Sequence, residues 1–246
     1  MKFSIVTCCW NSQPFFEQCI ESTVTQTHDD LEIVFVDGGS TDGTLEMIHS
    51  VQGQKTVLNG ISGGIAKAMN AGIQAATGDV IAHLHSDDYY LDSGVLQRVA
   101  SVFERTGCHW LFGRVMSDID GSLVPESFDV PRYSYRKMLH RNFIPHPATF
   151  IRREVFEQCG LFDERLRFAM DYDLWLRIGK VFEPVQLDEH LAVFRRHEGS
   201  TTQANQMRSF NEDFQVRMRN APLKDKAEAV LRYAVRRARL HREGVR

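Results

Sequence analysis

The feature that most constrains the fold is an alternation of apolar, strand-like runs with helical segments over the first 90 residues. The runs at 3–7, 31–37 and 79–85 are continuously apolar at their centres, as is typical of strands buried on both faces of a parallel sheet. Turn residues in "CCWNSQP" and "GGSTDGT" begin the first two helices, and a third helix covers "GGIAKAMNAGIQAAT". We therefore expect three β-α units in an α/β fold with a largely parallel sheet and helices on both faces.

The second half of the chain alternates less regularly. Residues 110–125 have the pattern of a hairpin that turns at Asp120-Gly121, and residues 133–160 that of a helix, a loop and a second helix start. A further helix begins near Asp171. We interpret residues 1–90 and 91–220 as two halves of one domain, the second of which adds another binding surface to the same sheet.

Length and cysteine usage narrow the class of protein. A chain of 246 residues with 43% hydrophobic residues is long enough to bury a large core. Its five cysteines include no Cys-x-x-Cys pair, which favours a reducing compartment over a zinc or disulfide framework. The N-terminal segment lacks the pattern of a signal peptide, and no run of ~18 apolar residues predicts a membrane span. We therefore expect a cytoplasmic protein.

The C-terminal segment is basic, whereas the rest of the chain is acidic. Residues 224–246 contain eight Lys or Arg and three Asp or Glu, which leaves 21 basic and 29 acidic residues for positions 1–223. An acidic body argues against a nucleic-acid partner. We predict that residues 221–246 form a basic helical tail. Two interpretations of its apolar positions remain open: peripheral contact with anionic lipid at the inner face of the plasma membrane, or packing on its own domain with arginines outside.

Polar residues follow the expected strand ends at 8–12, 37–44 and 85–88. Ligands of such sheets bind beyond the carboxyl ends of the strands, so we expect these loops to line one crevice. Ser86, Asp87 and Asp88 are hard oxygen donors of the kind that Mg²⁺ or Mn²⁺ binds together with substrate phosphates. The same residue types are common in turns, so a metal site and an ordinary turn are alternatives for this motif.

Two further residues at this edge are candidates for contact with a nucleotide. Asp37 can accept a hydrogen bond from a base N–H or a sugar hydroxyl, and the glycines after it let a ligand approach the backbone. Helix capping accounts for Ser40 or Asp42 better than for Asp37. Trp10 either stacks on a planar base or covers the end of the sheet.

A pair of acids opens the helix near position 171. Asp171 and Asp173 are candidates for proton acceptance, or else only cap the helix and stabilise its dipole. Because residues two apart on a helix point to different faces, at most one of them is expected to act as a base.

The remaining candidates are basic or imidazole side chains. Arg195, Arg196 and His197 either bind diphosphate and metal or form a solvated basic turn. His146 and Arg152 are candidates for contact with a second substrate, and a structural role for both is the alternative.

Six motifs, taken in order, resemble the family-2 glycosyltransferases with the GT-A fold, of the colanic-acid or surface-polysaccharide type. Each motif is modest, but six in the right order over residues 3–202 are specific. They are "FSIVTCCWN", "IVFVDGGSTDGT", "GGIAKAMNAGIQAATGDVIAHLHSDD", "HPATFIRREVFEQCGLFDE", "MDYDLWLR" and "FRRHEGSTT".

The resemblance implies a Rossmann-like mixed central sheet flanked by helices, with a C-terminal helical extension. It also implies an inverting hexosyltransferase, dependent on Mn²⁺ or Mg²⁺, that moves a sugar from a nucleotide-diphospho-sugar, by preference a UDP-sugar, to a glycan or lipid-linked polysaccharide precursor. Asp171 matches the family's general base, Asp88 the metal-binding end of its DxD-type motif, and His197 the segment that closes over metal and diphosphate. The positions expected to bind the nucleotide-sugar are Thr7, Cys8, Trp10, Asn11, Asp37, Lys67, Asn70, Ser86 and Asp87, and those expected to bind the acceptor are His146 and Arg152.

The chain departs from the family pattern at three positions. Met170 precedes Asp171 where Glu is common, Lys67 stands where many relatives carry Asp, and Met69 where others carry Arg. These departures keep a second hypothesis open, a catalytically degenerate sugar-nucleotide-binding or scaffold protein. A nucleotidyltransferase and a Rossmann oxidoreductase are disfavoured, because no glycine-rich phosphate loop follows the first strand.

Overall fold

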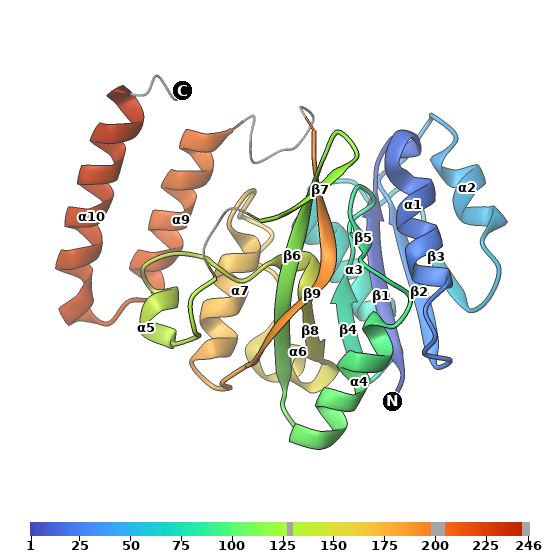
Figure 1. Ribbon diagram of the computed structural model, residues 1–246. Helices are drawn as coiled ribbons and strands as arrows, with labels where there is room; N and C mark the ends of the chain where they lie inside the picture. The colour runs from blue at the N-terminus through green and yellow to red at the C-terminus, as the bar shows by residue number, and fades with distance from the viewer. Residues whose placement is uncertain (127–129, 198–204, 243–246) are drawn as a thin grey trace.

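The computed structural model describes residues 1–126, 130–197 and 205–242, and its centre is a twisted sheet between two layers of helices (Figure 1). Within the described residues the sheet order is β3-β2-β1-β4-β8-β6-β9-β5, and β7 pairs with β6. The strands are β1 (Phe3–Cys9), β2 (Leu31–Asp37), β3 (Lys55–Leu58), β4 (Val80–His83), β5 (Tyr89–Tyr90), β6 (Trp110–Ile119), β7 (Ser122–Pro125), β8 (Thr149–Arg152) and β9 (Val185–Arg196).

Helices cover both faces of this sheet. One hydrophobic cluster lies under α3, α6 and α7, and the other under α1, α2 and α4. The helices are α1 (Gln13–Val24), α2 (Thr44–Ser50), α3 (Ile65–Ala75), α4 (Val95–Thr106), α5 (Tyr135–Met138), α6 (Arg153–Cys159), α7 (Met170–Gly179), α9 (Gln206–Asn220) and α10 (Leu223–Arg242), with a 3₁₀ turn η1 (His146–Ala148).

The central strands are apolar on both faces because each side chain meets a helix layer. In β1, Ile5 belongs to the cluster under α1 and α4, whereas its neighbour Val6 belongs to the cluster under α3. Every residue of β1 is buried. The continuous apolar run that predicted a doubly covered strand is therefore confirmed.

The expected elements of the first half are confirmed, and so is the hairpin of β6 and β7 around Asp120 and Gly121. Four strands were not expected. β3 adds to the edge of β2 in parallel, and β8 pairs antiparallel with both β4 and β6, where a loop had been expected within residues 133–160. The other two, β5 and β9, pair antiparallel with each other. β3 and β8 have four residues each and β5 two, too few for a clear apolar periodicity.

Strand direction determines where the loops meet. β1, β2, β3, β4, β6 and β9 run the same way, since β8 is antiparallel to β4 and β6 and the remaining pairs of this set are parallel. The chain therefore leaves β1, β2, β4 and β9 at one edge of the sheet. Segments far apart in sequence, such as 10–12, 85–88 and 195–197, come together there.

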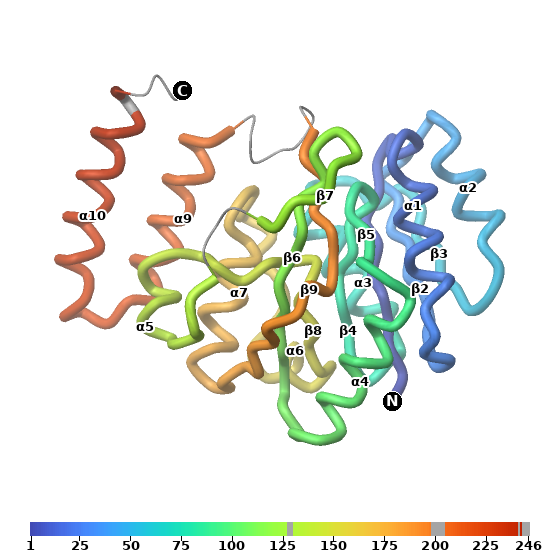
Figure 2. Tube along the Cα trace, viewed as in Figure 1, coloured from blue at the N-terminus to red at the C-terminus, as the bar shows by residue number. Residues whose placement is uncertain are grey.

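The C-terminal part is a pair of helices at the end of the molecule opposite α2 (Figure 2). α9 packs on α7, and α10 packs on α9. Tyr233 of α10 stacks on Phe210 and Phe214 of α9, with ring centroids 5.0 and 4.0 Å apart. The interpretation in which the tail packs on its own domain is thus confirmed for one face of α10. No described helix is both long enough and apolar enough to span a membrane.

Candidate active site

The loops after β1 and β2 are tied to each other. Asn11, whose φ of 50° lies in the left-handed region, accepts a hydrogen bond at Oδ1 from the Thr41 amide (2.9 Å), and its own amide donates to Ser40 Oγ (2.9 Å). This leaves Trp10 at the rim with 69% of its surface exposed. Trp10 therefore does not cover the end of the sheet, and its indole face is open to a planar ligand.

The Asp37 carboxylate shapes the second loop. It is fully buried and accepts hydrogen bonds from the amides of Gly39 (2.7 Å) and Ser40 (2.9 Å) and from Ser40 Oγ (2.5 Å). Asp42 accepts bonds from the amide and hydroxyl of Thr44 at the start of α2. The expectation that capping applies to Asp42 and does not account for Asp37 is confirmed, because the Asp37 oxygens bind donors of the loop before α2 and not the start of the helix.

Other residues expected to bind the nucleotide-sugar have different surroundings. Thr7 and Cys8 are buried in β1, and burial raises the pKa of the Cys8 thiol above its usual range, so it is neutral. The Asn70 amide joins α3 to the segment after α6, donating to the Phe162 carbonyl (3.0 Å) and accepting from the Phe162 amide (2.9 Å). Lys67 is exposed in the first turn of α3. Asn70 therefore has a structural role, whereas Lys67 is accessible to a ligand.

Asp88 lies under the end of β9. Its Oδ1 accepts a hydrogen bond from the Arg195 amide (3.1 Å), and the Arg195 guanidinium forms an ion pair with Asp118 (3.3 Å). Burial raises the pKa of Asp88 well above its usual range, and the charge of Asp87 adds to this, whereas Arg195 opposes it. Asp88 is thus a desolvated carboxylate that a cation would stabilise in its ionised form.

Asp87 faces the chain just after β9. Its Oδ2 lies 3.1 Å from His197 Nε2, and the imidazole packs against Phe15 with ring centroids 4.8 Å apart. In the same loop, Ser86 Oγ lies 2.8 Å from Ser12 Oγ, so the first and fourth strand ends are directly linked. The expectation that the loops at 8–12 and 85–88 lie at one edge is confirmed, and His197 lies at the same edge.

The donor atoms at this edge fit a divalent cation that also binds substrate. The Asp87 carboxylate meets the His197 imidazole, and Asp88, next to Asp87 in the chain, accepts a hydrogen bond from the Arg195 amide. Among the described residues, no three or more His, Cys, Asp or Glu side chains are arranged to hold a metal by themselves. Such a partial set is what Mg²⁺ or Mn²⁺ uses when phosphate oxygens and water complete the shell.

The two arginines of this segment are not part of a solvated turn. Arg196 pairs with Glu126 at 2.6 Å, and Arg195 stands over the rings of Phe15 and Tyr89 at 5.0 and 5.3 Å. Both belong to strand β9 rather than to a turn. Their guanidinium groups hold the strand end that carries His197.

Asp171 is in the first turn of α7, half-buried. It accepts hydrogen bonds from the Tyr172 amide (2.6 Å) and from Asn142 Nδ2 (3.2 Å). Burial raises the pKa of Asp171 to about 6, the two hydrogen bonds work against this rise, and the charge of Glu212 adds to it. A carboxylate with a pKa near neutrality is suited to general base catalysis.

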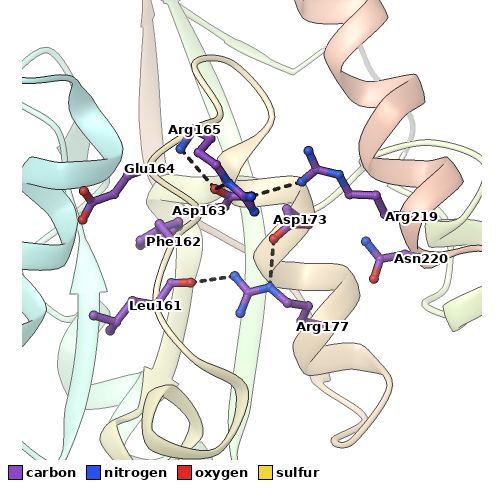
Figure 3. Close-up of a pocket in the computed structure, with 9 residues that line it drawn as sticks. All are labelled: Leu161, Phe162, Asp163, Glu164, Arg165, Asp173, Arg177, Arg219 and Asn220. Atoms are coloured by element: carbon purple, nitrogen blue, oxygen red, sulfur yellow. Dashed lines mark hydrogen bonds and ion pairs between the residues drawn. The ribbon is translucent and has the colours of Figure 1, made fainter.

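Asp173 faces away from the Asp171 carboxylate, as expected for residues two apart on a helix. It forms an ion pair with Arg177 one turn later (2.8 Å). Both line a cavity of about 540 Å³ between α7, α9 and the segment after α6, in which Arg165 and Arg219 both bind Asp163 (Figure 3). Because these arginines are all paired with acids, the cavity presents little net charge to an anionic ligand.

His146 packs inside a group of rings. Its centroid lies 5.4 Å from His83, 5.2 Å from His85 and 5.6 Å from Trp175. Burial and the two other imidazoles lower the pKa of His146 well below its usual range, so it is neutral. The segment 142–146 thus connects Asn142, which binds Asp171, to the loop that carries the SDD motif.

Arg152 lies at the opposite edge of the sheet, and its assignment to an acceptor site is wrong. In the antiparallel pair of β4 and β8, Arg152 is opposite Val80, at the start of β4, whereas Asp87 and Asp88 follow the end of β4. Its guanidinium donates to the Cys108 carbonyl (2.8 Å). Strand β8 was not expected. Because it runs antiparallel to β4, its last residue, Arg152, lies at the edge of the sheet opposite the crevice.

A comparison with known protein families shows to which family the chain belongs. The family model described as glycosyl transferase family 2 matches residues 4–160. The chain belongs to this family. The resemblance seen in the six motifs to this family is thereby confirmed.

Individual relatives are consistent with this family assignment. An uncharacterized glycosyltransferase of Bacillus subtilis, EpsJ, is 32% identical over 219 residues, which are 81% of this chain. The chain spans 62% of the length of EpsJ.

Solved structures confirm the fold. TarS of S. aureus in complex with UDP-GlcNAc superposes with a TM-score of 0.74 at 20% identity, over 95% of this chain and 71% of that one. The mannosyltransferase PcManGT of Pyrobaculum calidifontis, in complex with GDP-Man and Mn²⁺, gives 0.70 at 16% identity, over 98% and 75%. The fold is the GT-A fold that the sequence predicted.

Two residues of this glycosyltransferase site gave no signal in the sequence. Asn142 bonds Asp171 from 29 positions earlier, and Glu212 acts on it from α9. Neither belongs to a recognisable motif. Only the tertiary packing of α7 brings them to Asp171.

Proposed function

We propose that the protein transfers a single sugar from a nucleotide-diphospho-sugar, by preference a UDP-sugar, to a hydroxyl of a glycan or lipid-linked polysaccharide precursor. The transfer inverts the anomeric configuration. Asp171 is the general base, and Asp87, Asp88 and His197 are the protein ligands of a divalent cation, Mn²⁺ or Mg²⁺.

The observation that carries this proposal is the state of Asp171. The residue is half-buried, hydrogen-bonded by Asn142, and has a pKa of about 6. It is therefore ionised at neutral pH yet basic enough to accept a proton from a hydroxyl that attacks carbon. An acid used only for capping would be expected to keep a low pKa.

The reaction follows from these residues. Asp171 takes the proton of the acceptor hydroxyl as its oxygen bonds to the anomeric carbon, and the bond from that carbon to the diphosphate oxygen breaks on the opposite side. A bound divalent cation supplies Lewis-acid stabilisation of the diphosphate that leaves. Asp87, Asp88 and His197 hold their donor atoms at the strand edge where that charge develops.

The donor nucleotide is proposed to lie along the loops after β1 and β2. The open indole of Trp10 is the surface on which the base stacks, and Lys67 is free to meet phosphate. Two structures of the same fold support a nucleotide-sugar, since TarS is seen with UDP-GlcNAc and PcManGT with GDP-Man. Asn11, Asp37 and Ser86 contribute by holding the shape of these loops.

We also propose that residues 221–246 are an appendage to a catalytic domain of residues 1–220, through which the protein contacts anionic membrane on the cytoplasmic side. The five cysteines are free, as in proteins of reducing compartments. The face of α10 that turns away from α9 exposes four large apolar side chains, with Lys224 and Arg242 on the same side. These apolar residues are Leu223, Val230, Leu231 and Val235.

Sedimentation with vesicles tests the membrane contact. Vesicles of phosphatidylcholine with phosphatidylglycerol should bring down the protein, and pure phosphatidylcholine should not. The double change Leu231→Ser and Val235→Ser should abolish binding, whereas Val181→Ser, at an equally exposed position outside α10, should leave it unchanged. Equal sedimentation of all three proteins would rule out α10 as the contact.

Turnover of a donor tests the transferase and its alternative, a catalytically degenerate binding protein. UDP-, GDP- and dTDP-sugars are incubated with Mn²⁺ and scored for hydrolysis or transfer. Asp171→Asn should lower the rate by roughly 10²- to 10⁴-fold, the usual contribution of a positioned base, with donor affinity retained. Donor binding without metal-dependent turnover in the wild type would support the degenerate protein instead.

A further inference from the structure

Helix α9 is bound to the start of α7 through one carboxylate. Glu212 Oε2 accepts hydrogen bonds from the amides of Phe168 (2.5 Å) and Ala169 (2.7 Å), and both of its oxygens accept from the Arg167 amide (3.0 and 3.1 Å). The residue at the N-cap of α7, Ala169, makes no side-chain cap of its own. Glu212 therefore satisfies three backbone donors in the turn that leads into the helix.

This turn ends directly before the base. Asp171 is the second residue of α7, two positions after the last amide that Glu212 binds. The position and direction of the first helical turn follow from the backbone that enters it. A shift of the 167–169 turn would thus move the Asp171 carboxylate with it.

We propose that Glu212 is a positioning residue for Asp171, which fixes the entry of α7 from a separate helix. This inference rests on the proposed role of Asp171 as the base. Met170 stands where relatives with the same motif often have Glu, and the Glu212 carboxylate reaches the turn just before Met170 from α9. Neither the matched family segment, residues 4–160, nor any motif of the sequence includes Glu212.

The charged groups around Asp171 come mainly from α9. Glu212 raises the pKa of Asp171, and the pKa of Asp213, the next residue, is itself raised to about 7 by burial and then by the charge of Asp171. Arg217, one turn later, donates to Tyr172 Oη at 3.5 Å and lowers the pKa of Asp213. From α10, Arg236 also lowers the pKa of Asp213.

Two substitutions separate position from charge. Glu212→Gln keeps an amide oxygen that can accept the backbone bonds but removes the negative charge, so kcat should stay within about threefold. The acidic limb of its pH profile, where kcat falls as Asp171 becomes protonated, should move to lower pH. The reason is that the like charge that raises the pKa of Asp171 is gone. Glu212→Ala removes bonds and charge together, and kcat should fall by roughly 10- to 100-fold, as expected when a reacting group is displaced by about 1 Å.

The matched control is Glu228→Ala on α10, which breaks an exposed ion pair with Arg232 one turn away (2.8 Å) and touches nothing at Asp171. It should leave kcat and the pH profile unchanged. In all variants KM for the donor should be unchanged, because the donor loops lie on other elements.

A folded Glu212→Ala protein with the kcat and the acidic limb of the wild type would overturn the proposal. Where Glu212→Ala fails to fold, an unshifted acidic limb in Glu212→Gln would overturn it.

The pKa of Asp171, followed by carboxyl NMR, gives a reading that needs no turnover. It should be lower in both Glu212 variants than in wild type and in Glu228→Ala. If wild type shows no transfer, the proposed function fails, and the NMR comparison still decides the inference. If wild type is active but the Glu212 variants match it in kcat and in the pKa of Asp171, the inference alone fails.

Discussion

Asp171 owes its chemistry to burial rather than to its neighbours in sequence. Its pKa rises to about 6 because α7, α9 and the 142–146 segment remove water from it, even though two hydrogen bonds favour the charged form. The motif identified the residue, but its basicity depends on atoms that lie 29 and 41 positions away. This separation is why the sequence predicted the base and not its environment.

The pH dependence of turnover follows from this value. Asp171 accepts a proton only when ionised, so kcat should be constant above about pH 7 and fall about tenfold per pH unit below pH 6. Initial rates at saturating donor and acceptor between pH 4.5 and 8.5 measure the profile, and calorimetry at the same pH values shows that the donor is still bound. A limb near pH 4 would contradict a buried base.

The same burial means that ionised Asp171 destabilises the folded state at neutral pH. Its pKa is higher in the folded chain than in the unfolded one, so the folded state binds more protons between about pH 4 and 6, and stability falls as pH rises through that window. Asp171→Asn, which cannot ionise, should therefore have a higher melting temperature than wild type at pH 7.5, and the difference should vanish near pH 4. A lower melting temperature at pH 7.5 would show that the carboxylate is needed for packing.

Metal binding is the third test at the residue scale. Asp88→Asn and His197→Ala should each weaken Mn²⁺ binding in the presence of UDP by roughly 10- to 100-fold, the range seen when groups that hold a metal are lost. Asp92→Asn is the control, because Asp92 lies in the same loop region but is paired with Arg98 at 2.9 Å on the surface. Calorimetric titration of Mn²⁺ measures all three, and equal affinities would remove Asp88 and His197 from the site.

At the scale of elements, the sequence predicted what periodicity can show. The first two β-α units were found because β1 and β2 are continuously apolar at their centres, and the β6–β7 hairpin because Asp120 and Gly121 mark its turn. β8 has only four residues, and its omission put Arg152 at the wrong edge. Asn70 was assigned to the donor because a helix pattern does not show that its amide bonds Phe162, 92 positions later.

The contact of α3 with the sheet gives a prediction at the same scale. A Cβ on Gly72 would lie 2.3 Å from Val6 Cγ1 and 3.2 Å from Val36 Cγ2. Gly72→Ala should therefore push α3 off β1 and β2 and lower the free energy of unfolding by about 1–3 kcal/mol. In Gly94→Ala the nearest atoms are the ends of two surface side chains, Arg98 (2.9 Å) and Asp92 (3.2 Å), which can shift together, so the loss should stay below about 1 kcal/mol. Urea denaturation measures both, and equal losses would contradict the close packing of α3.

For the whole molecule, the direction of the strands explains why the site is composite. Strands β1, β2, β4 and β9 end at one edge, so the loops that carry Trp10, Asp37, Asp88 and His197 converge although they span most of the chain. Asp171, the proposed base, comes from α7, and Glu212 of α9 binds the turn that leads into this helix. The order of motifs predicted the convergence, because it follows from sheet topology, whereas the contribution of α9 does not.

Binding at this composite edge should stabilise the entire fold. A ligand that binds only the folded chain at 100 times its Kd adds about 2.7 kcal/mol, which for a chain of this size raises the melting temperature by roughly 5–10 °C. UDP with Mn²⁺ should give this shift, and UDP alone a smaller one, since the diphosphate and the cation complete each other's binding.

Trp10→Ala should reduce the shift in melting temperature, because its exposed indole is the proposed surface for the base. Asp171→Asn should keep the full shift while losing turnover, which would place donor binding and proton transfer on different parts of the molecule. Thermal denaturation with UDP, GDP and dTDP, each with and without Mn²⁺, measures these effects, and the absence of any shift would contradict a nucleotide site at the ends of β1 and β2.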